Sequence, residues 1–118
     1  MELSKDLIAA SATPLVLSIL KESDSYGYAI IKRVKELSEK EMNWTDGMLY
    51  PVLHRLEKKD YIRSYWENSQ SGRRRKYYSL TQNGSENLEN LKSQWWLVHK
   101  TLNRIWGQGF NVQLEGAY

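Results

Sequence analysis

The 118 residues suffice for one compact domain, and hydrophobic residues, 41% of the composition, are enough to build a core. The formal net charge is only +3, so any argument from charge must depend on clusters rather than on the total. Cysteine is absent, which excludes disulfides and thiolate metal ligands. Residues 1–11 lack the long apolar region of a signal peptide, and no apolar run is long enough to span a bilayer. We therefore expect a soluble cytoplasmic protein.

Residues 3–21 have a helical pattern, with apolar side chains at Leu15, Val16, Ile19 and Leu20. Pro14 interrupts this pattern, because a proline inside a helix removes a hydrogen bond and bends the helix. Two alternatives remain open. The segment is either one bent helix or a short leader that ends near Thr13, where Thr13 caps a helix whose first residue is Pro14.

A second helix is predicted over residues 26–38, after a turn at 22–25 (E-S-D-S) that can also cap it. Its apolar positions share one face: Ile30, Ile31, Val34 and Leu37. A third helix is predicted to begin near Thr45, a favourable N-cap residue. Its apolar residues recur at i, i+3, i+4 and i+7, which predicts a buried stripe of Leu49, Val52, Leu53 and Leu56. The opposite face then presents Gly47, Tyr50, Pro51, His54, Arg55 and Lys58.

Residues 61–67 and 75–80 alternate in the manner of two antiparallel strands, and Ser71-Gly72 is the turn between them. Thr81 can cap a last helix over residues 82–106, with Gly107 and Gly109 marking its end. Along this helix apolar residues step by 3 and 4, a heptad seam typical of a helix packed on another helix: Leu88, Leu91, Trp95, Val98, Leu102 and Ile105.

The predicted fold is therefore mostly α-helical with a small antiparallel β-hairpin. The order helix, strand, basic turn, strand is that of a winged helix-turn-helix, which we assign to residues 1–81. Residues 82–118 are assigned to a C-terminal dimerisation helix and tail, because a winged helix closed by three helices and a hairpin leaves the apolar seam without an internal partner. Internal packing of the seam is the alternative.

The pattern favours DNA as a partner. A helix fits the major groove, where Tyr50, His54 and Arg55 are long enough to reach base edges, and Gly47 lets the helix N-terminus approach a phosphate. Four adjacent cations, Arg73 to Lys76, lie at the hairpin turn, and strand alternation sends them to both sides. Two or three of them can then reach one phosphate backbone or a minor groove. The candidate DNA contacts are Tyr26, Thr45, Gly47, Tyr50, His54, Arg55, Arg73, Arg74 and Lys76.

Trp95 and Trp96 lie in the heptad seam, either as interface anchors or around a gap that admits a flat apolar molecule. The candidate ligand residues are Trp95, Trp96, Val98 and His99. An enzyme is not expected, because His54 and His99 are far apart and no nucleophile or phosphate-binding motif is present. For the same reasons no cofactor and no metal site are expected.

Two runs carry a family resemblance: M-L-Y-P-V-L-H-R-L-E-K-K-D-Y-I and the wing S-G-R-R-R-K-Y-Y-S-L-T-Q-N-G, with S-Y-G-Y-A-I-I-K before them. Over about residues 4–106 the chain resembles the PadR family of bacterial transcriptional regulators, in particular its small subfamily, which includes multidrug-sensing repressors. The resemblance implies a homodimeric repressor that binds an inverted repeat and releases it when a small molecule binds. It also implies that Trp95, with its symmetry mate, stacks on flat aromatic drugs at the dimer interface.

We therefore expect a sequence-specific transcriptional regulator that binds a palindromic operator in double-stranded DNA as a homodimer. A small aromatic, phenolic or drug-like effector is its expected ligand, and no membrane partner is expected. The alternative is a winged-helix interaction or dimerisation module in which the basic wing is merely solvated.

Overall fold

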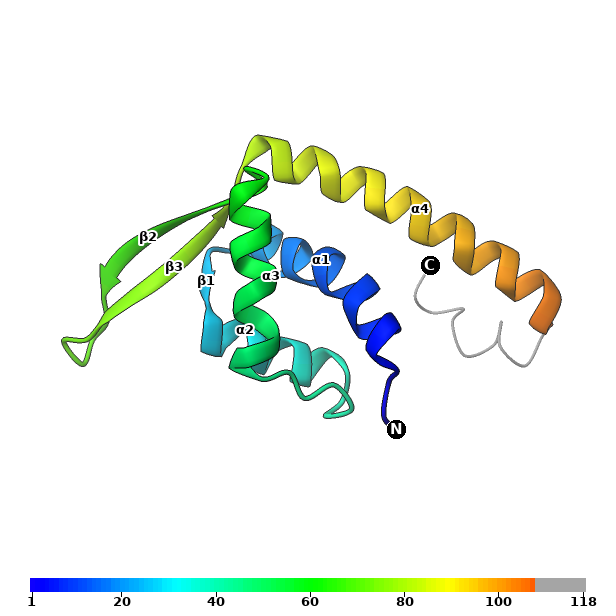
Figure 1. Ribbon diagram of the computed structural model, residues 1–118, viewed down its shortest axis with the longest axis horizontal. Coiled ribbons are helices and arrows are strands. Elements are labelled where there is room, and N and C mark those ends of the chain that lie inside the picture. Colours follow the sequence, from blue (N-terminus) through cyan, green and yellow to red (C-terminus); the bar gives the residue numbers. More distant parts are fainter. Residues whose placement is uncertain (108–118) are drawn as a thin grey trace. The chain divides into compact units, whose positions relative to one another are not determined.

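The computed structural model of the protein describes residues 1–107, in which four helices and three strands follow one another along the chain (Figure 1). The helices are α1 (Lys5–Glu22), α2 (Gly27–Leu37), α3 (Asp46–Lys58) and α4 (Gln82–Trp106), and the strands are β1 (Ser25–Tyr26), β2 (Ile62–Asn68) and β3 (Arg74–Leu80). The predicted fold class, mostly helical with a small antiparallel sheet, is confirmed.

The chain divides into two compact units, Met1–Leu88 and Glu89–Tyr118, which are described separately. The division falls inside α4, whereas the sequence placed the boundary at residues 81 and 82. The physical reason is burial: Gly84 and Leu88, in the first turns of α4, are part of the core of the first unit.

α1 is one helix that continues through Pro14, so the alternative of a leader ending near Thr13 is wrong. The helix begins at Lys5, well before Pro14, because Ser4 is its N-cap. Ser4 Oγ accepts a hydrogen bond from the Leu7 N–H at 3.2 Å. The helix buries one side against the core through Ala12, Val16, Leu17, Ile19 and Leu20. This apolar face lies on both sides of the proline, so tertiary packing supports the helix where one backbone hydrogen bond is missing.

α2 and α3 form the helix-turn-helix pair. The predicted N-cap of α3 is confirmed, since Thr45 Oγ1 accepts a hydrogen bond from the Met48 N–H at 3.3 Å. The predicted stripe of α3 is also buried: Leu49, Val52, Leu53 and Leu56. In α2, Ile30 and Val34 are buried, but Leu37 is 52% exposed because it is the last helical residue, beyond the contact with the core.

The sheet has three antiparallel strands in the order β1-β3-β2, so the predicted hairpin is joined by a strand that the sequence did not reveal. In the β1–β3 pair, Ser25 lies opposite Tyr78 and Tyr26 opposite Tyr77. The expectation that the segment 22–25 is a turn that caps α2 is wrong. α1 extends to Glu22, and the N-cap of α2 is Tyr26, which makes no side-chain capping hydrogen bond.

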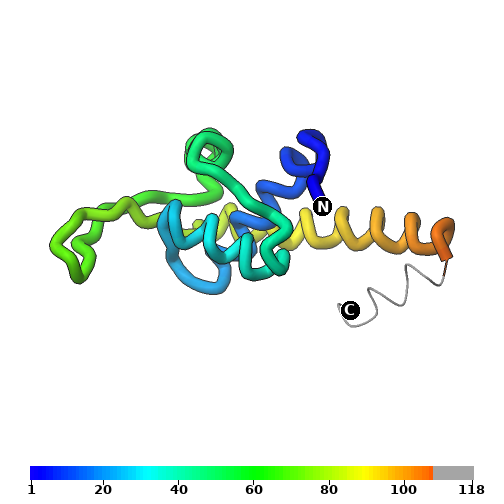
Figure 2. The backbone as a smooth tube through the Cα atoms, turned by 90° about the horizontal axis from the view of Figure 1, so that it is seen from below, coloured from blue at the N-terminus to red at the C-terminus, as the bar shows by residue number. Residues whose placement is uncertain are grey.

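The hairpin of β2 and β3 projects from the helices of the first unit (Figure 2). Its predicted turn is confirmed, because Gly72 adopts a left-handed backbone with φ of +86° and donates its N–H to the Ser69 carbonyl. α4 begins where predicted, and Thr81 Oγ1 accepts a hydrogen bond from the Gly84 N–H at 2.9 Å. α4 is followed by Gly107, with φ of +82°, whereas Gly109 and the tail to Tyr118 lie outside the described residues.

Candidate nucleic-acid interface

The exposed face of α3 carries the predicted contact residues on the side opposite to its buried stripe. Gly47, His54 and Lys58 are exposed, as is Thr45 at the N-cap, and Tyr50 is 47% exposed. Arg55 is also exposed, but its Nη2 donates to Thr13 Oγ1 on α1 at 3.3 Å. Arg55 therefore lies at the edge of the face that is turned toward α1, while Tyr50 and His54 remain on the face itself.

Tyr50 is placed by a close approach between α3 and the start of α2. Its hydroxyl lies over Gly27, and a Cβ atom at position 27 would lie 2.5 Å from that oxygen. Only a residue without a side chain leaves this space, so Gly27 determines where the Tyr50 ring can lie.

The cations of the wing separate onto two faces of β3, as strand alternation requires. Arg74 and Lys76 lie on the same face as Tyr78, whereas Arg75 lies on the opposite face with Tyr77. Arg73 lies in the turn and is exposed. The guanidinium of Arg74 lies over the exposed ring of Trp66, with its Cζ 5.1 Å from the ring centre.

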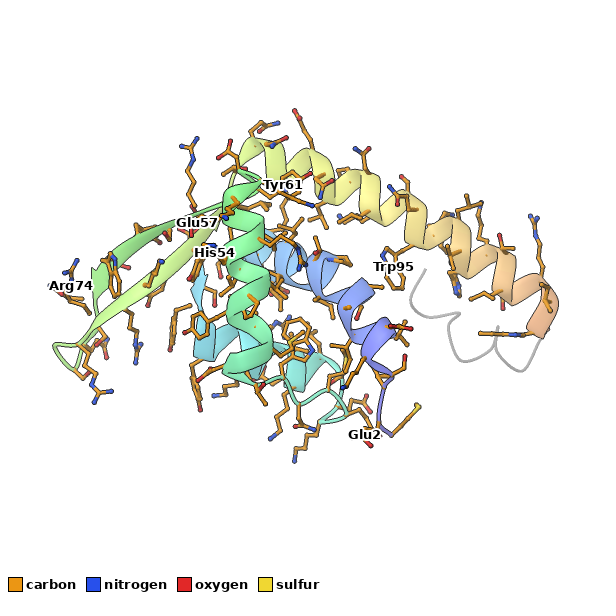
Figure 3. All side chains as sticks on the ribbon, viewed as in Figure 1. Glu2, His54, Glu57, Tyr61, Arg74 and Trp95 are labelled. Atoms are coloured by element: carbon orange, nitrogen blue, oxygen red, sulfur yellow. The ribbon has the colours of Figure 1, made fainter. Side chains whose placement is uncertain are left out.

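α3 packs against the face of the sheet that carries Tyr78, Lys76 and Arg74. Tyr78 is 4% exposed, and this burial, with smaller contributions from Glu57 and Tyr50 of α3, raises its pKa. On the neighbouring strand, Ser64 Oγ donates to Glu57 Oε2 at 2.6 Å. Because a strand rises about 3.3 Å per residue, Lys76 and Arg74 lie about 7 and 13 Å further along the same face than Tyr78. Basic side chains therefore continue outward from α3 on one side of the sheet; Figure 3 labels His54 on α3 and Arg74 on the hairpin.

The opposite face of the sheet carries a tyrosine layer, which we define as Tyr26, Tyr65 and Tyr77. The Tyr26 ring meets the Tyr77 ring edge-on at 5.2 Å, and the Tyr65 ring stacks on Tyr77 at 5.8 Å. The Arg75 guanidinium lies over the Tyr26 ring at 4.5 Å. Tyr26, a predicted DNA contact, is thus half-buried, with its ring between Tyr77 and Arg75.

The tyrosine layer ends in a hydrogen bond that Tyr65 Oη donates to Asp24 Oδ2 at 2.7 Å. This hydrogen bond to a carboxylate, assisted by partial desolvation and the negative charge of Asp24, raises the pKa of Tyr65 to about 12. Sequence reasoning did not single out Arg75, Tyr65 or Tyr77 as a group. The only sequence signal was their period of two, and the partner strand β1 was not foreseen.

α4 after Leu88 belongs to the second unit and is described by itself. Trp95 is 38% exposed and Val98 and Ile105 are exposed, while Leu91 and Leu102 are half-buried. Leu88, predicted at the dimer seam, is 1% exposed inside the first unit, so the apolar surface left on α4 starts at Leu91. The exposed ring of Trp96 lies 5.5 Å from that of His99, which is half-buried, and Lys100 Nζ lies 5.6 Å from the Trp96 ring.

Within residues 1–107, no group of three or more His, Cys, Asp or Glu side chains is arranged to hold a metal ion. None of the helices in this part of the chain has the length and apolar character needed to cross a membrane.

A winged helix-turn-helix with an exposed third helix and a cationic hairpin on the same side of the sheet defines a protein of the DNA-binding class. The family described as "Transcriptional regulator PadR-like family" matches residues 16–90, and the chain belongs to this family. Its members regulate transcription through DNA and are not enzymes.

The comparison with solved structures gives the same fold. A transcriptional regulator from Clostridium thermocellum is 33% identical, with a TM-score of 0.77 over 85% of this chain and 97% of that chain. A PadR family transcription regulator from Clostridium difficile R20291 is 38% identical, with a TM-score of 0.71 over 82% of this chain and 99% of that one.

Two curated relatives are similar in sequence. An uncharacterised protein X of Lysinibacillus sphaericus is 32% identical over 90 residues, which are 76% of this chain and 83% of that protein. The transcriptional regulator YqjI of Escherichia coli is 30% identical over 80 residues, which are 68% of this chain but only 37% of YqjI.

Proposed function

We propose that the protein is a homodimeric repressor that binds an inverted-repeat operator and releases it when a small aromatic ligand binds at the dimer interface. The DNA-binding part of the proposal depends on one observation, that the exposed residues of α3 and two cations of the wing lie on the same side of the sheet. Tyr50 and His54 are exposed on α3, and Arg74 and Lys76 continue along the sheet face on which α3 packs. In this arrangement α3 reads base edges in the major groove, and the wing cations bind the phosphates beside it.

The exposed apolar side chains of α4 support the homodimer. From Leu91 onward α4 carries large apolar side chains that are exposed in the single chain: Trp95, Leu97, Val98 and Ile105. Apolar surface of this kind on a charged, water-exposed helix is typical of an interface between subunits. A two-fold axis through this interface presents two copies of α3 to two half-sites about 34–36 Å apart, which is one turn of DNA.

The ligand part of the proposal depends on the aromatic side chains of the same helix. Trp95 and Trp96 supply two large rings, and Val98 and His99 follow them one turn later. Indole rings bind flat aromatic molecules by stacking, so a planar phenolic or cationic compound is the expected effector.

The first experiment is a mobility-shift titration of the dimer on the DNA upstream of its own gene, at several salt concentrations. A discrete complex that resists nonspecific competitor and weakens steeply with salt is expected, because log K falls by about 0.9 for each neutralised phosphate per decade of salt. The double variant Arg74→Ala/Lys76→Ala removes four cations from the dimer and should reduce that slope by close to four phosphates. The charge-matched control Lys32→Ala/Lys35→Ala, on the exposed surface of α2, should leave it unchanged. Equal slopes for all three proteins would remove the wing from DNA binding and favour a protein-interaction module.

A separate experiment tests the dimer and the ligand. Val98→Asp places a charge on the apolar side of α4 and should give a monomer in analytical ultracentrifugation, whereas Ser93→Asp, on the opposite side of the helix, should remain a dimer. Planar aromatic compounds should quench tryptophan fluorescence in the dimer and lose this effect in Trp95→Ala. Quenching that persists in Trp95→Ala would exclude the proposed ligand position.

A further inference from the structure

Three consecutive cations of β3 each lie over an aromatic ring, but the three rings belong to different parts of the molecule. Arg74 lies over Trp66 at 5.1 Å and Lys76 over Tyr78 at 5.8 Å, and both rings belong to the hairpin itself. Arg75 lies over Tyr26 at 4.5 Å, the shortest of the three distances. Tyr26 belongs to β1 and is the N-cap residue of α2. Among these cations, Arg75 is therefore the one that joins the wing to the helix-turn-helix.

Apart from this contact, the pairing between β1 and β3 that joins the hairpin to the start of α2 is short. β1 has two residues, and its pairing with β3 reaches only Tyr77 and Tyr78. Beyond Tyr77 toward the turn, β2 and β3 form a two-stranded ribbon, which is marginally stable when isolated in water. Arg75 lies two residues beyond Tyr77, at the first position on this face of the sheet past the end of β1, where the ribbon leaves the three-stranded sheet.

The tyrosine layer extends this contact across the sheet. Arg75 covers Tyr26, Tyr26 meets Tyr77, Tyr77 stacks on Tyr65, and Tyr65 donates its hydroxyl hydrogen to Asp24, in the segment between α1 and β1. The layer thus crosses the sheet and returns to the backbone segment that enters α2. Arg75 lies at the end of the tyrosine layer nearest the turn and is half-buried, whereas Arg74 lies on the opposite face of the sheet and is exposed. A guanidinium stacked on a ring is held in one orientation, away from the face on which α3 packs.

We propose that Arg75 is a positioning residue that fixes the direction of the wing by clamping it to Tyr26, while Arg74 and Lys76 bind the DNA phosphates. The proposal rests on DNA binding as proposed above. It gives Arg75 a different role from Arg74 and Lys76, although all three side chains carry the same charge. The wing then approaches DNA already oriented, so less conformational entropy is lost on binding.

The matched variants Arg75→Gln and Arg74→Gln test this division, because both remove one charge and keep a long polar side chain. Arg75→Gln should weaken operator binding by about two- to fivefold for each half-site, the range expected for one partly exposed cation–π contact per subunit, with an unchanged slope of log K against log salt. Arg74→Gln should reduce that slope by about 1.8, because the dimer loses two phosphate contacts of about 0.9 each. Arg75→Lys, which keeps a cation over the ring, should restore part of the affinity.

A double-mutant cycle gives the second test. Tyr26→Leu removes the ring, and Arg75→Gln in that background should have little further effect, because both substitutions break one contact. If Arg75 binds a phosphate by itself, the two effects will add and the salt slope of Arg75→Gln will fall as it does for Arg74→Gln. Either result would overturn the clamp.

A measurement on the free protein separates the clamp from the function on which it rests. Backbone ¹⁵N relaxation of the turn between β2 and β3 should show larger amplitude motion in Arg75→Gln than in Arg74→Gln. The reason is that Arg74 contacts Trp66, which belongs to the hairpin itself, so losing that contact does not free the hairpin from the helices. Equal relaxation in the two variants refutes the clamp even if DNA binding is established. If the expected difference in relaxation is present and the wild-type protein binds no DNA, the clamp stands as structure and the proposed function fails.

Discussion

Gly84→Ala tests how closely the start of α4 packs against the loop after α3. A Cβ atom at position 84 would overlap the carbonyl oxygen of Tyr61 and lie 2.8 Å from both its carbonyl carbon and Leu80 Cδ1. Carbon atoms pack best at about 3.5 Å or more, so the first turn of α4 must move by about 0.7 Å or more. The obstacle includes backbone, which cannot turn aside as a flexible side chain does.

This movement also strains the hydrogen bonds at the same junction. Thr81 donates its N–H to the Tyr61 carbonyl at 3.1 Å and its hydroxyl hydrogen to the Asp60 carbonyl at 2.6 Å. Overpacking a filled site costs about 1–3 kcal/mol, and weakening two hydrogen bonds costs about 1 kcal/mol each. Replacing glycine by alanine inside a helix returns at most about 1 kcal/mol. Together these values predict that Gly84→Ala lowers the free energy of unfolding by about 2–4 kcal/mol.

The assay is equilibrium unfolding in urea at one fixed protein concentration, because the stability of the proposed dimer would depend on concentration. Gly47→Ala is the matched control, since a Cβ atom there would meet only Thr45 Oγ1, at 4.0 Å. This control should be as stable as the wild type, or more stable by up to about 1 kcal/mol. If Gly84→Ala proves as stable as Gly47→Ala, the junction is not tightly packed and the reasoning is wrong.

Three further changes follow from named contacts. Thr45→Ala removes the acceptor at the N-terminus of α3 and should lower the free energy of unfolding by about 1 kcal/mol in the same urea assay. The pKa of Tyr65 in the folded protein, about 12, lies above its ordinary value of 10, so the folded state retains the proton longer and stability should fall as pH rises from 10 toward 12. Tyr65→Phe should abolish that part of the fall in alkaline unfolding curves, and a fall of the same size in the variant would contradict the hydrogen bond to Asp24. Gly27→Ala should displace the Tyr50 ring and weaken operator binding in mobility shifts while leaving the salt slope unchanged.

The elements that could be predicted from the sequence are those with their own periodicity and caps. The stripe of α3 has helical spacing, its N-cap Thr45 lies directly before Asp46, and both were found where expected. The turn of the hairpin depends on Gly72, and the start of α4 depends on Thr81, so both are local signals. Strand alternation also foretold that the wing cations would separate onto two faces, and Arg74 and Arg75 do so.

The features that could not be predicted depend on partners distant in the sequence. β1 is too short to have a period and exists because β3 provides its pairing partner. α1 continues through Pro14 because its buried face packs on the core, which no property of residues 13 and 14 reveals. The hydrogen bond from Arg55 to Thr13 joins α3 to α1, and it could not be predicted from the pattern of α3 alone. Among the candidate DNA contacts, the sequence therefore indicated which side of α3 is exposed but not which residues other elements hold.

α3 is held at both ends by close approaches to backbone. Near its N-terminus the Tyr50 hydroxyl lies over Gly27, and after its C-terminus the Tyr61 carbonyl meets Gly84 and accepts the Thr81 N–H. Among residues 1–107 no atom beyond Gly72 and its chain neighbours lies within 4 Å of a Cβ atom placed on Gly72 at the tip of the wing. The outermost ring contact on the face of the tyrosine layer is that of Arg75 on Tyr26. Substitutions at the glycines should therefore change stability or the placement of α3, whereas substitutions at the wing should change DNA affinity with little effect on unfolding. A wing variant that unfolds as easily as Gly84→Ala would contradict this division, because it would show that the hairpin supports α3 as much as the junction with α4 does.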